Sequence, residues 1–111
     1  MKIIFDKKRL GETCNSEKEC KREWGEAGAK KVGQRLKELA AADTLQDMWH
    51  IPAAGFHALH GDREGQYAVS LHGAFRLVFE AVREAEDEAA GEEVDLSEIR
   101  KIRVLEVTDY H

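Results

Sequence analysis

The hydrophobic period changes from helical to alternating near the middle of the chain. Before Pro52, a helix is expected from about Glu26 to Ala42, because its apolar residues recur every three or four positions. This apolar stripe consists of Ala29, Val32, Leu36 and Leu39. After Pro52, apolar and polar residues alternate over residues 66–72 and 75–82, which is typical of strands with one buried face. The change predicts an α+β domain in which helices pack on one face of an antiparallel sheet.

Shorter signals complete the predicted order of elements. Residues 2–5 favour a short first strand, and the capping-box pattern at 16–19 begins a helix that Gly25 ends. One further helical turn is expected at 45–49. Residues 102–107 are apolar on both faces, as in a central strand. The predicted order is an N-terminal strand, two helices and then an antiparallel sheet, within a single domain of 111 residues.

Charge is distributed unevenly along the chain. The net charge is −5, yet residues 84–98 carry eight acidic and no basic side chains, which leaves 14 acidic against 17 basic residues elsewhere. The remaining body is mildly basic and can bind RNA locally, although a charged surface without a partner fits equally well. The acidic insertion, at about 83–98, is longer than an ordinary hairpin loop. It is interpreted either as a solvated loop or partly disordered insertion, or as an acidic gate or partner-binding flap.

Several classes of site and location are disfavoured by the sequence. Cys14 and Cys20 are six residues apart, which is not a zinc-ligand spacing, so two reduced structural thiols are expected. No pair of histidines has the helical spacing of metal ligands, so neither a metal nor a cofactor is expected. Apolar stretches are too short for a signal peptide or a membrane span, which favours a soluble cytoplasmic protein.

Histidine and other ionisable residues that could carry acid–base or anion-binding chemistry gather in two segments. One is the run at 56–65, FHALHGDREG, followed by the strand that carries Arg76, and the other is the terminal Asp109-Tyr110-His111. Cleavage of RNA by attack of a 2′-hydroxyl on its own phosphate needs a base, an acid and cations. Imidazoles suit the first two roles because they titrate near neutral pH, and Arg76 offers a planar fork for phosphate oxygens. Taken alone, each histidine is more often an ordinary surface or core imidazole.

Together, these segments resemble the HigB-type toxins of the RelE superfamily, the ribosome-dependent messenger RNA endonucleases of bacterial toxin–antitoxin pairs. The resemblance covers residues 56–79 and 102–111, about a third of the chain, and is only architectural across the helices. It implies a RelE-like fold and endoribonuclease activity. The active site that it implies consists of His57, Arg76, Asp109, Tyr110 and His111.

Two further residues are candidate substrate contacts beside this site. His60 would assist at phosphate when protonated, although a solvated loop residue fits equally well. Arg63 lies between Asp62 and Glu64, so an ion pair within the turn is the alternative to phosphate binding. The family commonly has Lys where this chain has His60, and a short turn where it has the acidic insertion. Both departures weaken the attraction for phosphate.

The last strand decides whether this site can form. If it runs straight to the end, alternation puts Asp109 and His111 on one face and Tyr110 on the other. The predicted site also requires His57, Arg76 and His111 to converge on one concave surface.

The resemblance also implies the partners of the protein. These are messenger RNA, the translating ribosome and a cognate helix-turn-helix antitoxin, through which the toxin–antitoxin complex binds operator DNA. The predicted function is that of the toxin of a type II toxin–antitoxin system. An alternative is a catalytically weak relative that acts mainly as an antitoxin-binding partner or co-repressor. A third interpretation is an unrelated small α+β enzyme or scaffold.

Overall fold

The computed structural model describes residues 1–83 and 95–109. Its strands are β1 (Lys2–Phe5), β2 (His57–Ala58), β3 (Gln66–Ser70), β4 (Phe75–Ala81) and β5 (Lys101–Asp109). Its helices are α1 (Lys8–Cys14) and α2 (Glu17–Ala41), and short 3₁₀ turns span Leu45–His50, Pro52–Ala54, Gly61–Arg63 and Leu96–Glu98. The predictions for residues 84–94, Tyr110 and His111 lie outside the described residues.

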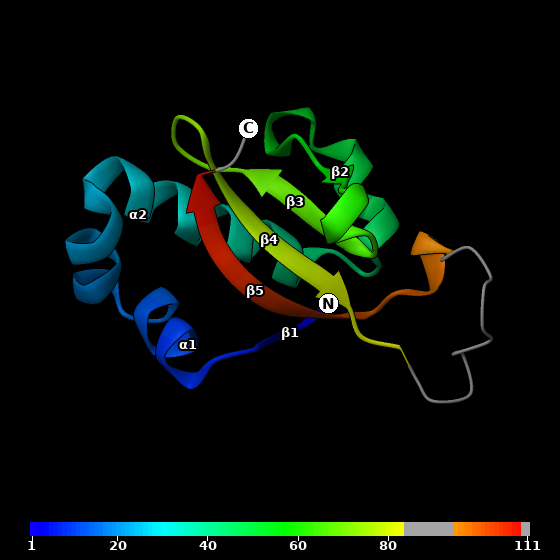
Figure 1. The fold of residues 1–111 in the computed structure, drawn as a ribbon, viewed down its shortest axis with the longest axis horizontal. Helices are drawn as coiled ribbons and strands as arrows, with labels where there is room; N and C mark the ends of the chain where they lie inside the picture. The colour runs from blue at the N-terminus through cyan, green and yellow to red at the C-terminus, as the bar shows by residue number, and fades with distance from the viewer. Residues whose placement is uncertain (84–94, 110–111) are drawn as a thin grey trace.

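The five strands form one mixed sheet in the order β1-β5-β4-β3-β2 (Figure 1). Neighbours from β2 to β5 are antiparallel, as the alternation predicts, whereas β1 runs parallel to β5 with Lys2 opposite Lys101. Parallel neighbours need a long crossover, and here everything between β1 and β5 supplies it. As predicted, β5 is an interior strand, with Ile102 and Val104 fully buried. The α+β class is therefore confirmed, with a parallel edge strand added to the expected antiparallel sheet.

A β-bulge interrupts the pairing of β4 with β5. Val78 lies opposite Glu106, but the next residue, Phe79, lies opposite Val104, so Leu105 is an extra residue on β5. Because successive side chains of a strand alternate between faces, one extra residue exchanges the faces for the remainder of the strand. The exchange explains why this segment reads as apolar on both sides.

The helical half follows the sequence signals, with one addition. At the start of α2 the Ser16 hydroxyl accepts the N–H of Glu19 at 3.2 Å, and Gly25 interrupts the helix with a φ of 75°, so the predicted break is confirmed. The addition is α1, whose charged first residues gave no apolar pattern. Gly11 lets α1 approach β1 closely, since a Cβ at this position would lie 3.2 Å from the Phe5 ring.

The second half of α2 covers one face of the sheet, and Figure 1 shows it passing behind β5 and β4. Ala29, Val32 and Leu39 of the stripe are buried there, and Leu36 is partly buried against the same core. The sheet residues of this core are Tyr67, Val69, Leu77, Phe79, Ile102 and Val104.

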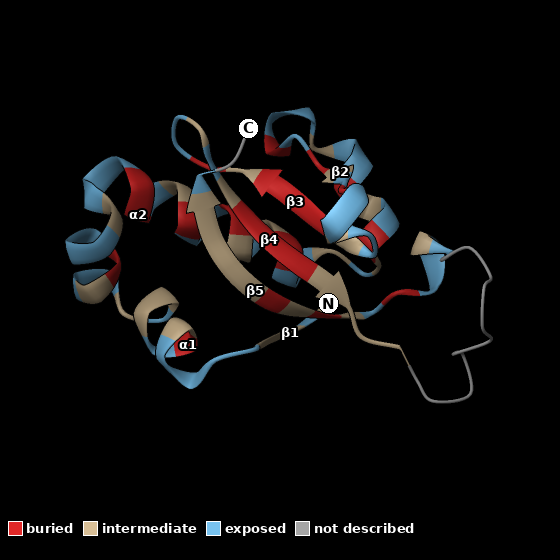
Figure 2. Ribbon diagram, in the orientation of Figure 1, coloured by how far each residue is buried: buried red, intermediate tan, exposed pale blue. Residues whose placement is uncertain are grey.

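The opposite side of the sheet, which carries Ala68 and Val78, is called the open face below. Its apolar cluster is small and consists of Leu59, Ala68 and Val78, and Figure 2 shows β3 and β4 buried beside a mostly half-exposed β5. Within the described ranges, no helix combines the length and the apolar character that a membrane span requires.

Candidate active site

His57 begins β2 and lies on the open face, directly opposite Ala68 of β3. Its Nδ1 lies 2.8 Å from the carbonyl oxygen of Gly55. A carbonyl oxygen has no proton to donate, so Nδ1–H is the donor, and the neutral ring carries its lone pair on Nε2. A half-buried imidazole in this tautomer can accept a proton at Nε2 and later release it, as general acid–base catalysis requires.

A low apolar floor extends across the open face from His57. Directly opposite residues of antiparallel strands share a face, and the register runs from His57 through Ala68 and Val78 to Glu106. Ala68 and Val78 are fully buried, and Leu59 packs beside them. Three strand spacings, about 14 Å, separate His57 from Glu106. An imidazole and a carboxylate therefore stand at the two ends of this floor.

Arg76 lies on the same face, one row further along the strands. It is two residues from Val78 on β4 and lies opposite Thr108, so it shares the face of His57. Its Nη1 donates to the carbonyl oxygens of Gly73 at 3.1 Å and Phe75 at 2.8 Å, both of which are neutral. Two strand spacings and two residues put its Cα roughly 12 Å from that of His57. The guanidinium is thus held at the end of the face by the turn between β3 and β4.

Arg63 reaches the open face from the turn Gly61–Arg63. Its Nη1 contacts Gln66 Oε1 at 3.1 Å and Glu106 Oε2 at 3.3 Å. The partner on β5 was not suggested by the acidic neighbours of Arg63 in the sequence. A second ion pair, from Arg103 to Glu80 at 2.6 Å, crosses the same face. Because all four side chains are partly exposed, solvent screens these pairs and a polyanion can compete for the arginines.

By its pairing, Asp109 lies on the face of the sheet that α2 covers. It lies opposite Phe75 at the end of β5, and Phe75 alternates with Arg76 along β4. The bulge at Leu105 is the reason, because it exchanges the two faces for the rest of β5. The structure therefore puts His57 and Arg76 on one face of the sheet and Asp109 on the other.

His60 is placed less centrally than His57 and Arg76. His60 is exposed immediately before the turn Gly61–Arg63, beside β2. Tyr110 and His111 lie outside the described residues. Among residues 1–83 and 95–109, no three His, Cys, Asp or Glu side chains gather closely enough to hold a metal ion.

Two residues of interest were not predicted from the sequence. Glu106 gave no signal, because its place beside Arg63 depends on the register of β5. Arg35 did give a signal in the sequence, because it lies three residues after Val32 and four before Leu39, within the apolar stripe. Its side chain is only 2% exposed, between α2 and the edge of the sheet.

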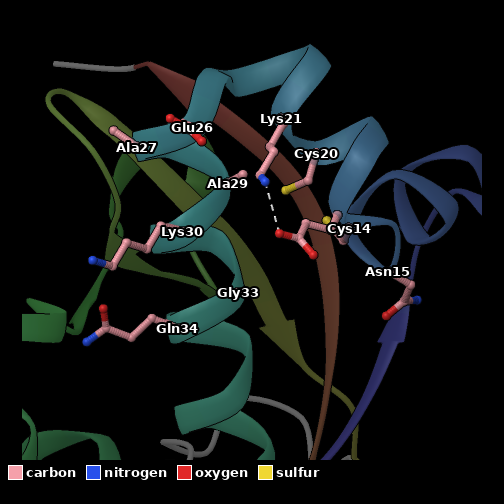
Figure 3. Close-up of a pocket in the computed structure, with 11 residues that line it drawn as sticks. Cys14, Asn15, Cys20, Lys21, Glu26, Ala27, Ala29, Lys30, Gly33 and Gln34 are labelled. Atoms are coloured by element: carbon pink, nitrogen blue, oxygen red, sulfur yellow. Dashed lines mark ion pairs between the residues drawn. The ribbon is translucent and has the colours of Figure 1, made fainter.

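A separate groove of about 760 Å³ lies between α1 and the two halves of α2, and its lining contains no strand residue (Figure 3). Cys14 and Cys20 line it, and both are free thiols. Burial, with a smaller contribution from the neighbouring Cys20, raises the pKa of the Cys14 thiol to about 12. A thiol with this pKa stays protonated at neutral pH, so the groove offers no thiolate nucleophile at Cys14.

The comparisons with known proteins bear on the fold. Neither a protein-family model nor the sequence of a curated protein matches the chain. In structure, the chain is similar to a YoeB/ParE toxin from Agrobacterium tumefaciens, with a TM-score of 0.57 and 10% sequence identity over 100% of both chains. At this identity the similarity shows a shared fold. The chain therefore shares the fold of this toxin, which agrees with the α+β fold class expected from its sequence.

Proposed function

We propose that the protein is the toxin of a type II toxin–antitoxin system, of the HigB type, and that it cleaves messenger RNA on the translating ribosome. The observation that carries the proposal is the tautomer of His57, whose Nδ1–H donates to the Gly55 carbonyl, so that the lone pair that can accept a proton is on Nε2. The toxin fold and the FHALHGDREG run support the same conclusion. The proposed place of action is the cytoplasm, where ribosomes and messengers are found.

The proposed reaction is a transesterification of RNA. Nε2 of His57 takes the proton of a 2′-hydroxyl, and the 2′-oxygen forms a bond to the adjacent phosphorus. The bond from phosphorus to the 5′-oxygen breaks, and the imidazole of His111 gives a proton to that oxygen. The products are a 2′,3′-cyclic phosphate and a 5′-hydroxyl, so the step balances without a further reactant.

In the proposal, the arginines of the open face stabilise the negative charge of the reacting phosphate. Arg76 is bonded only to neutral carbonyls among its described hydrogen-bond partners, so its charge can act on the phosphorane as it forms. His60 and Arg63 would contact flanking phosphates, Arg63 after exchanging Glu106 for RNA. In the proposal, Tyr110 positions a base and Asp109 polarises a neighbouring group.

The ion pairs of the open face explain why a ribosome would be needed. Arg63 and Arg103 are already paired with carboxylates, and sequence-independent affinity for RNA depends on many unpaired cations. Free RNA would therefore bind weakly, and the ribosome would present the messenger at high local concentration. The proposed second partner is a helix-turn-helix antitoxin, which would carry the complex to operator DNA.

Mapping RNA ends in bacteria that express the chain tests this function. We expect new 5′-hydroxyl ends inside translated reading frames, and their loss when the start codon of the reporter message is removed. Equal cleavage of the untranslated reporter would contradict ribosome dependence. The absence of any new ends would contradict the nuclease itself.

The same ion pairs favour a second candidate, a catalytically weak relative that mainly binds an antitoxin. Their carboxylates lower the positive charge of the open face, as does His60 in place of the usual Lys. Expression without the antitoxin distinguishes the two candidates. Growth arrest with RNA cleavage supports the nuclease, whereas normal growth with tight antitoxin binding supports the binding partner.

A further inference from the structure

Arg35 is the one charged side chain that is buried in the described part of the chain. Removing a guanidinium from water costs several kcal/mol unless its donors are satisfied. Here Nε donates to the Ser70 carbonyl at 2.7 Å, Nη2 to the Ala53 carbonyl at 2.7 Å, and Nη1 to Glu38 at 2.9 Å. An apolar residue would fill the same stripe without that cost. The three bonds therefore point to a role other than filling the core.

The two carbonyls that Arg35 binds belong to segments that meet beside β2. Ser70 ends β3, and β2 pairs only with Ala68 and Tyr67, so it stops before it reaches Ser70. Arg35 supplies a donor for the carbonyl at this point of the sheet edge. Its other fork nitrogen holds Ala53, in the turn that leads into β2. One planar group thus clamps the end of β3 to the entry of β2.

Gly55 connects this clamp to His57. It has a φ of 57°, and a Cβ at this position would lie 2.5 Å from the Ser70 hydroxyl oxygen. The backbone of Gly55 is therefore in close contact with Ser70, one of the two residues whose carbonyls Arg35 binds. The carbonyl of the same Gly55 accepts the Nδ1–H of His57 at 2.8 Å. Since β2 has only two residues, strand pairing alone restrains this carbonyl weakly.

We propose that Arg35 is a positioning residue for His57, which acts by holding the Gly55 carbonyl where it selects the Nδ1–H tautomer. This inference rests on the proposed role of His57 in RNA cleavage. Arg35 itself lies on the covered side of the sheet edge and does not touch the substrate. It determines which ring nitrogen is the proton acceptor on the open face.

The Arg35→Lys variant tests the proposal, because one ammonium keeps the charge beside Glu38 but lacks the rigid fork that binds two carbonyls at once. The first readout is ¹⁵N NMR of the neutral His57 ring in the purified protein. We expect the ratio of the Nδ1–H to the Nε2–H tautomer to fall about fivefold, the change that follows loss of an ordinary hydrogen bond. The second readout is single-turnover cleavage on ribosomes that carry a defined messenger. We expect the maximal rate to fall about 10- to 100-fold, with the half-saturating concentration unchanged.

Val32→Ala is the matched control, since it removes buried volume from the same helical stripe and leaves the clamp intact. It should lower the melting temperature without changing the tautomer ratio or the maximal rate. An Arg35→Lys protein that is folded but keeps the wild-type tautomer ratio overturns the proposal. If that variant does not fold, Gly55→Ala, which pushes Gly55 away from Ser70 while Arg35 remains, must produce the same two changes, and an unchanged ratio again overturns it.

The two readouts separate this proposal from the proposed function. If the wild-type protein cleaves no RNA, the nuclease assignment fails, yet the tautomer ratio still shows whether Arg35 positions His57.

Discussion

Replacing His57 by asparagine removes the imidazole from β2 but keeps an N–H donor for the Gly55 carbonyl. The asparagine amide nitrogen can take nearly the place of Nδ1, so the bond of 2.8 Å can be retained, whereas alanine loses it. Loss of one such bond costs about 1 kcal/mol. In a domain of this size that corresponds to a fall of about 4–8 °C in melting temperature. We expect the asparagine variant to melt near the wild type and the alanine variant several degrees lower.

Both variants lose the proton acceptor, so messenger cleavage should fall at least ~100-fold in each, the scale of general acid–base catalysis. The assay measures the cleavage rate of one defined messenger on purified bacterial ribosomes, beside a thermal melt of each variant. His72→Asn is the matched control, because His72 is an exposed imidazole in the turn between β3 and β4. Near-normal cleavage by the folded His57→Asn variant would refute the reasoning. An equal loss in the His72 variant would show that the effect is not specific to His57.

Three further predictions concern other parts of the chain. Glu106→Gln removes the carboxylate that pairs with Arg63 at 3.3 Å, so the dissociation constant for messenger-loaded ribosomes should fall about fivefold at low salt. An unchanged dissociation constant would contradict the idea that Glu106 and RNA compete for Arg63. Deleting Tyr110 and His111 should abolish cleavage and leave the melting temperature nearly unchanged, and a truncated protein that still cleaves would exclude both from the site. Because burial raises the pKa of Cys14 from 9.0 to about 12, the folded thiol keeps its proton where the unfolded one loses it. Stability should therefore fall as pH rises above 9, and alkylation at pH 8 should be slow in the folded protein and fast in urea; fast alkylation of the folded protein would contradict this.

Local patterns predicted much of the fold. The stripe along α2, the break at Gly25 and the hairpin of β3 and β4 each depend on residues close in sequence, and all three are present. Residues 8–14 form α1 although they show little apolar periodicity, because packing of Gly11 on Phe5 stabilises the helix. The two-residue β2 is too short to produce any period. Its existence depends on the partner strand that it meets.

The candidate site was predicted by residue type and only in part by position. His57 and Arg76 share the open face, and their roles in a site stay predictions. The face of Asp109 could not be predicted, since it depends on one extra residue in the pairing of β4 with β5. The partner of Arg63 and the bonds of Arg35 join residues 43, 35 and 18 positions apart. Sequence patterns of helical or strand period do not contain such contacts.

The bulge at Leu105 makes the length of β5, more than the identity of its residues, the sensitive property of this strand. Inserting one residue after Leu105, or pairing every residue of the strand without the bulge, would shift the alternation by one position, which would carry Glu106 beneath α2 and turn Val107 outward. A carboxylate forced into that core would cost far more than an exposed valine. Relatives that diverge in this region are therefore expected to accumulate replacements, and to change the length of β5 only where Glu106 stays on the open face and Val107 on the covered face. Replacements along β5 are thus better tolerated than changes of length that exchange its two faces, even where each single side chain is dispensable.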